Sequence, residues 1–156
     1  MLRLTKKADY GLMALKYLAE NSESMSLSAK DIAEAYHIPQ QLLAKILQRL
    51  AKEGLLRSHA GMNGGYTLSR KPNEISAFEV IRAIDGPLFI TSCVTVSGIC
   101  DLTSSCTIKE PLARVNESIS ELLKSIRISD LVESDHAHRA THNSEPELVN
   151  IQTAGA

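Results

Sequence analysis

The stretch from Tyr36 to Gly54 constrains the fold more than any other part of this 156-residue sequence. Pro39 suits the first turn of a helix, because its missing N–H needs no partner there, and Gly54 suits the position just beyond the helix end. We therefore predict a helix over residues 39–53, entered through a tight turn at residues 36–38. Its buried face is predicted from apolar residues that recur every three or four positions: Leu42, Leu43, Ile46, Leu47 and Leu50.

Helix-capping patterns predict three further helices around this one. Thr5 can cap a first helix that ends near Glu20, before a polar stretch. Ser28 and an acidic residue three positions later predict a short helix through about Ala35. A full capping box at residues 76–79 predicts a helix that ends at Asp85.

A glycine-rich segment follows the 39–53 helix and predicts a β-hairpin. Residues 55–58 and 66–69 are suited to two short strands, and the glycines between them permit the backbone angles of a hairpin tip. A short helix, a tight turn, a longer helix and a hairpin in this order are typical of a winged helix-turn-helix. In that fold the second helix enters the DNA major groove.

The polar side of the 39–53 helix supplies the candidate DNA contacts. Glutamine can read adenine through paired hydrogen bonds, and lysine or arginine can read guanine or hold phosphates. An ordinary amphipathic helix with a solvated polar face is the alternative interpretation. The candidate DNA-binding residues are Gln40, Gln41, Lys45, Gln48, Arg49 and Lys52 on the helix and His59 and Tyr66 on the hairpin.

The distribution of charge agrees with a nucleic-acid partner for the N-terminal half. Residues 1–71 contain 11 Lys and Arg against 6 Asp and Glu, whereas residues 72–156 contain 6 against 12. A basic module attracts polyanions, and an acidic remainder keeps the chain soluble. The sequence has no signal-peptide pattern and no apolar run long enough to span a bilayer, so we expect a cytoplasmic protein without membrane contact.

Three cysteines lie in an irregular segment, residues 88–109, which lacks a sustained helical period. Cys93, Cys100 and Cys106 are too widely spaced for the close pairs typical of structural zinc sites. Thiolates spread along a loop can instead hold an iron-sulfur cluster, which takes four ligands. Three unrelated thiols remain the alternative, and a catalytic cysteine is less favoured because no nearby base is evident.

A second long helix is predicted to start at Pro111. One apolar stripe extends along residues 111–127, and the chain becomes polar from Val132. We therefore divide the chain into a winged helix-turn-helix domain at 1–87, a cysteine loop at 88–109, a long C-terminal helix at 110–131 and a disordered tail at 132–156. The predicted fold class is mainly α with a small β-hairpin wing.

Several motifs together resemble the Rrf2 family of bacterial transcription regulators, the IscR, NsrR and CymR type. They are residues 4–10, the segment from Asp31 to Pro39, the Gly64-Gly65-Tyr66 of the hairpin and the three-cysteine loop. This resemblance implies a homodimer on a palindromic operator, with crossed C-terminal dimerisation helices and a cluster near the interface. It also implies that Cys93, Cys100 and Cys106 are metal ligands.

The fourth ligand of the cluster differs between branches of this family. One branch places a histidine three residues after the third cysteine, where this chain has Lys109, a poor ligand while protonated. Nitric-oxide-sensing members resemble this chain in having an aspartate near the start of the first helix, which implies that Asp9 of the partner subunit is the ligand. Many relatives carry an arginine in the wing where this chain has Ala60.

The expected function is therefore that of a DNA-binding repressor that depends on an iron-sulfur cluster, 2Fe-2S or 4Fe-4S, and responds to cluster status, redox state or nitric oxide. The overall pattern is most similar to regulators of the SUF iron-sulfur assembly system. A metal-free cysteine redox regulator and a small iron-sulfur electron carrier or enzyme are the alternatives. The basic N-terminal half and the wing speak against the last of these, and we expect no enzymatic activity.

Overall fold

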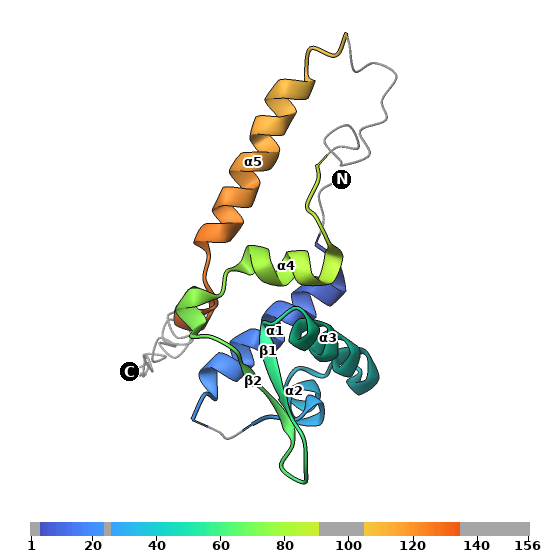
Figure 1. The fold of residues 1–156 in the computed structure, drawn as a ribbon, viewed down its shortest axis with the longest axis vertical. Helices are drawn as coiled ribbons and strands as arrows, with labels where there is room; N and C mark the ends of the chain where they lie inside the picture. The colour runs from blue at the N-terminus through green and yellow to red at the C-terminus, as the bar shows by residue number, and fades with distance from the viewer. Residues whose placement is uncertain (1–3, 24–25, 91–104, 135–156) are drawn as a thin grey trace, which may run out of the picture.

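The computed structural model describes residues 4–23, 26–90 and 105–134 of the chain (Figure 1). In these ranges the fold is mainly helical with one antiparallel hairpin, which confirms the predicted fold class. The elements are α1 (Lys6–Glu20), α2 (Ala29–Tyr36), α3 (Gln40–Lys52), β1 (Leu56–His59), β2 (Gly65–Leu68), the 3-10 turn η1 (Pro72–Glu74), α4 (Ala77–Asp85) and α5 (Lys109–Ser125).

The three predicted caps are present. The Thr5 hydroxyl accepts a hydrogen bond from the Ala8 N–H at 3.2 Å and begins α1. Ser28 and Ser76 form complete capping boxes with the acidic residues three positions later. Hydrogen bonds from the hydroxyl and the backbone N–H of Ser28 hold the pKa of Asp31 below its usual value. Local sequence signals thus fix where α1, α2 and α4 begin.

The core lies where α1, α2, α3 and α4 meet. Because the apolar positions of α3 recur at helical spacing, one side of the helix is buried and the other faces outward. Leu42, expected in the core, is only half-buried and lies at the edge of this face. The largest fully buried side chains are Leu15, Ile32, Leu43, Leu47, Leu50, Ile75, Ile81, Ile128 and Val80.

The connection between α2 and α3 is the predicted tight turn. His37 has a positive φ of 53°, and the N–H of Ile38 donates to the carbonyl of Ala33 at 3.0 Å. Pro39 has an extended ψ of 120° and is the N-cap rather than the first helical residue, so α3 starts one residue later than predicted. Gly54, just past the helix end, has the expected positive φ of 81°.

The hairpin pairs β1 with β2 in antiparallel register, with His59 opposite Gly65. Each strand is displaced by one residue from its predicted position. Leu55 is not part of β1, because its N–H donates to the carbonyl of Leu50 and closes the end of α3. Its side chain is buried, and its carbonyl accepts a bond from the Ser69 N–H. The strand therefore begins only at Leu56.

Helix α5 projects away from the N-terminal domain (Figure 1). It begins at Lys109, two residues before the predicted start, and Pro111 lies in its first turn, where the missing N–H leaves no bond unmade. None of the helices described here combines the length and the apolar character that a bilayer span requires.

The chain returns from α5 to the N-terminal domain. The N–H of Ala77 donates to the carbonyl of Ile126, and the N–H of Ile128 donates to the carbonyl of Ile75. The Ile128 side chain is fully buried in the core, and residues 128–134 are helical. The segment after α5, assigned from the sequence to the end of the C-terminal helix, thus completes the core of the N-terminal domain. The predicted start of the tail at residue 132 lies inside this helical turn.

Candidate nucleic-acid interface and cysteine site

The outward face of α3 carries most of the predicted DNA contacts. Gln41, Lys45, Gln48 and Lys52 recur at intervals of three or four residues, so they share one side of the helix. All four are exposed, and so is Gln40 at the helix start. The structure thus brings five predicted residues together on a single polar surface that follows the tight turn. We refer to this surface, Gln40, Gln41, Lys45, Gln48 and Lys52, as the recognition face.

Arg49 differs from its neighbours on α3. Its Nε donates a hydrogen bond of 2.7 Å to the carbonyl oxygen of Ala83, near the end of α4. The side chain is thereby held against α4 rather than directed freely outward with the recognition face. Sequence spacing alone could not reveal this contact, because its acceptor is a backbone carbonyl 34 residues away.

The two hairpin candidates have different surroundings. His59 is exposed, and its Nε2 lies 2.8 Å from the hydroxyl of Thr67 across the hairpin. Tyr66 is half-buried against the core, and its backbone N–H and carbonyl both bond to Leu27. Tyr66 therefore has a structural role that its position in the motif did not reveal.

Sequence reasoning also missed Met62. This side chain is completely exposed at the hairpin tip. It follows Gly61, which has a positive φ of 107°. The Ser26 hydroxyl donates to the backbone carbonyl of Asn63 at 2.6 Å and ties the tip to the segment before α2. The tip is therefore held in place by a contact from outside the hairpin.

The first residue of β2, Gly65, lies too close to a neighbouring backbone segment for any side chain. A Cβ at this position would collide with the carbonyl of Leu27 and would lie 2.9 Å from the N–H nitrogen of Ser28. Because these are backbone atoms of a paired segment, they cannot move aside as a flexible side chain can. The close backbone approach between the hairpin and the segment before α2 thus requires glycine.

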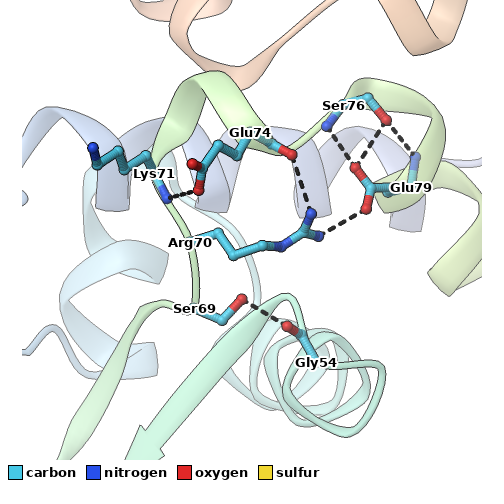
Figure 2. Close-up of polar contacts among 7 residues, drawn as sticks. All are labelled: Gly54, Ser69, Arg70, Lys71, Glu74, Ser76 and Glu79. Atoms are coloured by element: carbon cyan, nitrogen blue, oxygen red, sulfur yellow. Dashed lines mark hydrogen bonds and ion pairs between the residues drawn. The ribbon is translucent and has the colours of Figure 1, made fainter.

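A network of polar contacts connects the base of the hairpin to α3 and α4 (Figure 2). The Ser69 hydroxyl donates to the carbonyl of Gly54 at 2.6 Å. The two Nη atoms of Arg70 donate to the carbonyl of Glu74 at 3.1 Å and to the carboxylate of Glu79 at 2.7 Å. The orientation of the hairpin is therefore coupled to the start of α4.

Glu79 is the central acceptor of this network. Its second carboxylate oxygen accepts bonds from the backbone N–H and the hydroxyl of Ser76, at 2.9 and 3.1 Å. Partial burial alone would raise the pKa of Glu79, but the bonds from Ser76 and Arg70 outweigh it and hold the pKa below the ordinary value of 4.5. The ionised carboxylate is thus the form that stabilises the fold.

Glu79→Gln is expected to lower the free energy of unfolding at neutral pH by about 0.5 kcal/mol, because the ion pair with Arg70 is more than a third exposed. Because the pKa is lowered in the folded state, this contribution is present above the unfolded pKa and is lost as the pH falls below about 4.5. Urea unfolding at pH 7 and pH 3 measures the contribution of Glu79 to the free energy of unfolding. Glu23→Gln, a substitution at an exposed position, is the control. A difference between wild type and Glu79→Gln that grows on acidification would contradict this assignment.

Among the candidate metal ligands, the structure describes Cys106 and Asp9. Cys106 is half-buried and lies three residues before the start of α5. Asp9 is exposed in the first turn of α1 and lines a shallow depression of about 300 Å³ together with Leu12, Met13, Lys16 and Leu131. Cys93 and Cys100 lie outside the described residues.

The two described ligand candidates come from different elements. The start of α5 is far from α1, at the end of the helix that points away from the N-terminal domain (Figure 1). Within the described ranges, no three histidine, cysteine or acidic side chains are grouped as a metal site. Within the described residues, Asp9 and Cys106 are thus not part of one group of metal-binding side chains.

Helix α5 and the residue before it carry an apolar seam that the described part of the chain leaves exposed. Ile108, Val115 and Leu122 are spaced seven residues apart and are 60%, 47% and 62% exposed. This spacing places them in line along one side of the helix. Leu112, Ile119, Leu123 and Ile126 are only half-buried, and none of the α5 residues is fully buried.

The chain is similar to known proteins over most of its length. Residues 4–134 match the family model Rrf2, described as an iron-dependent transcriptional regulator. Protein aau3 of Rhizobium meliloti (strain 1021) is 34% identical over 134 residues, which are 85% of this chain and 86% of that protein.

Solved structures show the same fold. CymR (YrzC), the global cysteine regulator of B. subtilis, superposes with a TM-score of 0.72 at 27% identity and covers 86% of this chain and 98% of its own. IscR of T. potens superposes with a TM-score of 0.67 at 27% identity and covers 94% of this chain and 93% of its own. Both the fold and the sequence agree, so this chain belongs to the Rrf2 family of transcription regulators.

Proposed function

We propose that the protein is a homodimeric repressor that binds a palindromic operator in the cytoplasm and that an iron-sulfur cluster controls its affinity. Cys93, Cys100 and Cys106 supply three ligands, and Asp9 of the partner subunit supplies the fourth. Rrf2 regulators bind DNA, so the DNA-binding part of this proposal follows the family. The observation that carries the dimeric part is the exposed apolar seam of α5, because a second copy of the helix would cover it.

The residues present fit an iron-sulfur cluster. Cysteine thiolates are the usual protein ligands of such clusters, and a carboxylate oxygen can also bind iron. Cys106 is half-buried and lies three residues before the start of a 17-residue helix. Asp9 is exposed and thus accessible to a second chain. When bound, the cluster supplies an iron centre that reacts with oxygen or nitric oxide.

Two hydrogen bonds support a connection between the ligands and the recognition face. The Thr5 hydroxyl donates to the carboxylate of Asp85 at 2.6 Å, which joins the start of α1 to the last residue of α4, shortly before the cysteine loop. The Arg49 bond to Ala83 joins α3 to the same end of α4. A displacement of Asp9 or of the cysteine loop would therefore be transmitted to the end of α4. The end of α4 in turn contacts α3 through Arg49.

The targets that we propose are genes of iron-sulfur assembly, because the sequence pattern is most similar to SUF-system regulators. A repressor of these genes that binds its operator when it holds a cluster would be released when clusters become scarce. We therefore propose that the cluster-bearing form has the higher operator affinity.

A metal-free thiol redox regulator is the second candidate function. It is supported by the similarity to CymR, a global cysteine regulator. Visible absorption and iron and sulfide content of the anaerobically purified protein distinguish the two, because a cluster absorbs visible light and bare thiols do not.

The DNA-binding role of α3 predicts that Gln41→Ala weakens binding to the native operator by about tenfold or more, since one lost pair of base contacts costs about 1–3 kcal/mol. Binding to a scrambled duplex should change little, because glutamine carries no charge. Fluorescence anisotropy with both duplexes measures this, and Asn73→Ala on η1 is an exposed control. Unchanged operator binding in Gln41→Ala and Lys45→Ala would remove α3 from the interface.

A further inference from the structure

A small depression lies where the start of α1, the side of α3 and the end of α4 meet. Its volume is about 210 Å³. Three of its lining residues are cationic and three are aliphatic, and none is acidic. The residues are Lys7, Leu42, Lys45, Ile46, Arg49 and Ile84.

The three cations around this depression lack anionic partners in the described part of the chain. No ion pair joins Lys7 or Lys45 to a described residue, and Arg49 donates its Nε to a neutral backbone carbonyl. Asp85, at the end of α4, does not line the depression, and its carboxylate accepts a hydrogen bond from the Thr5 hydroxyl. Like charges that converge without a counter-charge repel each other, and an anion in the depression would remove this cost.

The position of Lys7 strengthens this interpretation. It lies in the first turn of α1, where the positive end of the helix dipole disfavours a cation. Asp9, two residues later, lines a different depression. An anion near Lys7 would therefore be attracted both by its ammonium group and by this end of the helix dipole.

The depression adjoins the recognition face, because Lys45 belongs to both. An anion bound there would lie beside a helix in the major groove, and the phosphates of the DNA backbone border that groove. The aliphatic floor has no hydrogen-bonding groups with which to read a base edge. The Nε bond of Arg49 to Ala83 orients its guanidinium and leaves the two Nη groups for the anion.

We propose that Lys7, Lys45 and Arg49 form a phosphate-binding pocket that holds one backbone phosphate of each operator half-site. This inference rests on the proposed DNA binding and adds Lys7 to the interface. It also assigns Arg49 to the DNA backbone rather than to a base. The pocket positions the protein on DNA and contributes no sequence preference.

The test is the salt dependence of DNA binding by the full-length dimer with Lys7→Gln. Each phosphate contact contributes about 0.9 to the slope of log K against log salt concentration. Two pockets per dimer therefore predict that Lys7→Gln makes the slope shallower by about 1–2. The affinities for the operator and for a scrambled duplex should fall by the same factor, about tenfold at low salt. Lys6→Gln is the matched control, because it removes the same charge one residue earlier and does not line the pocket.

Several results would overturn the inference. Equal slopes for Lys7→Gln and Lys6→Gln would show that Lys7 contacts no phosphate, and a loss confined to the operator would indicate base reading. If Lys7→Gln instead abolishes stabilisation by inorganic phosphate in thermal unfolding and leaves the DNA slope intact, the pocket binds a free anion. If Gln41→Ala weakens DNA binding but Lys7→Gln does not, the result contradicts the phosphate-binding pocket and leaves the proposed function intact.

Discussion

Leu122→Glu is expected to convert the proposed dimer into monomers and to lower operator affinity by about a hundredfold or more. Leu122 is 62% exposed in the single chain and lies in line with Val115 and Ile108 on α5. In the proposed dimer this seam is covered, so the substitution would bury a carboxylate in each of two copies. An unpaired buried charge costs about 3–5 kcal/mol. A monomer can no longer bind two half-sites simultaneously, and this loss lowers DNA affinity by about 10²–10⁴-fold.

Light scattering after size-exclusion chromatography measures the oligomeric state, and anisotropy measures operator binding. Glu117→Lys is the control, because Glu117 is exposed on the other side of α5 and changes charge without entering the seam. It should leave the dimer intact. A dimer that survives Leu122→Glu would show that α5 is not the dimer interface.

Loss of the cluster is the second large effect that the account predicts. Cys93→Ala, Cys100→Ala and Cys106→Ala should each abolish stable cluster binding, because only two cysteine thiolates, the usual ligands of iron-sulfur clusters, would remain. Asp9→Ala should retain a weaker cluster, since water or an external thiol can fill a single site. Iron and sulfide content per chain and visible absorption, measured without oxygen, report the result.

Mixed dimers test whether the fourth ligand crosses the interface. A chain with Asp9→Ala is combined with a chain that lacks the three cysteines. If the ligand crosses, the cysteines of the first chain meet the Asp9 of the second and one ordinary site is recovered. No recovery, with intact mixed dimers, would place the fourth ligand elsewhere. Full cluster retention in any single cysteine variant would contradict the proposed ligand set.

Local signals in the sequence were sufficient for most of the fold. A hydroxyl or carboxylate that caps a helix acts within three residues, so Thr5, Ser28 and Ser76 place their helices correctly. The apolar period of α3 and the position of Gly54 are equally local. The strand ends were displaced by one residue, because Leu55 uses its N–H to close α3.

The contacts that the sequence did not reveal join residues far apart in the chain. Ile128 enters the core through bonds to the segment around Ile75, which no local period encodes. Arg49 and Lys7 look like ordinary exposed cations until α1, α3 and α4 are placed together. The polar face of α3 was predictable because it depends only on helical spacing.

Operator affinity in three states of one preparation tests the central claim most directly. The states are the anaerobic cluster-bearing protein, the same sample after exposure to nitric oxide or oxygen, and the apo-protein, all at one salt concentration because phosphate contacts make affinity salt-dependent. We expect the cluster-bearing form to bind the native operator at least about tenfold more tightly than the other two, a difference of about 1.4 kcal/mol. Equal affinities in all three states would contradict control by the cluster, even in a protein that holds one.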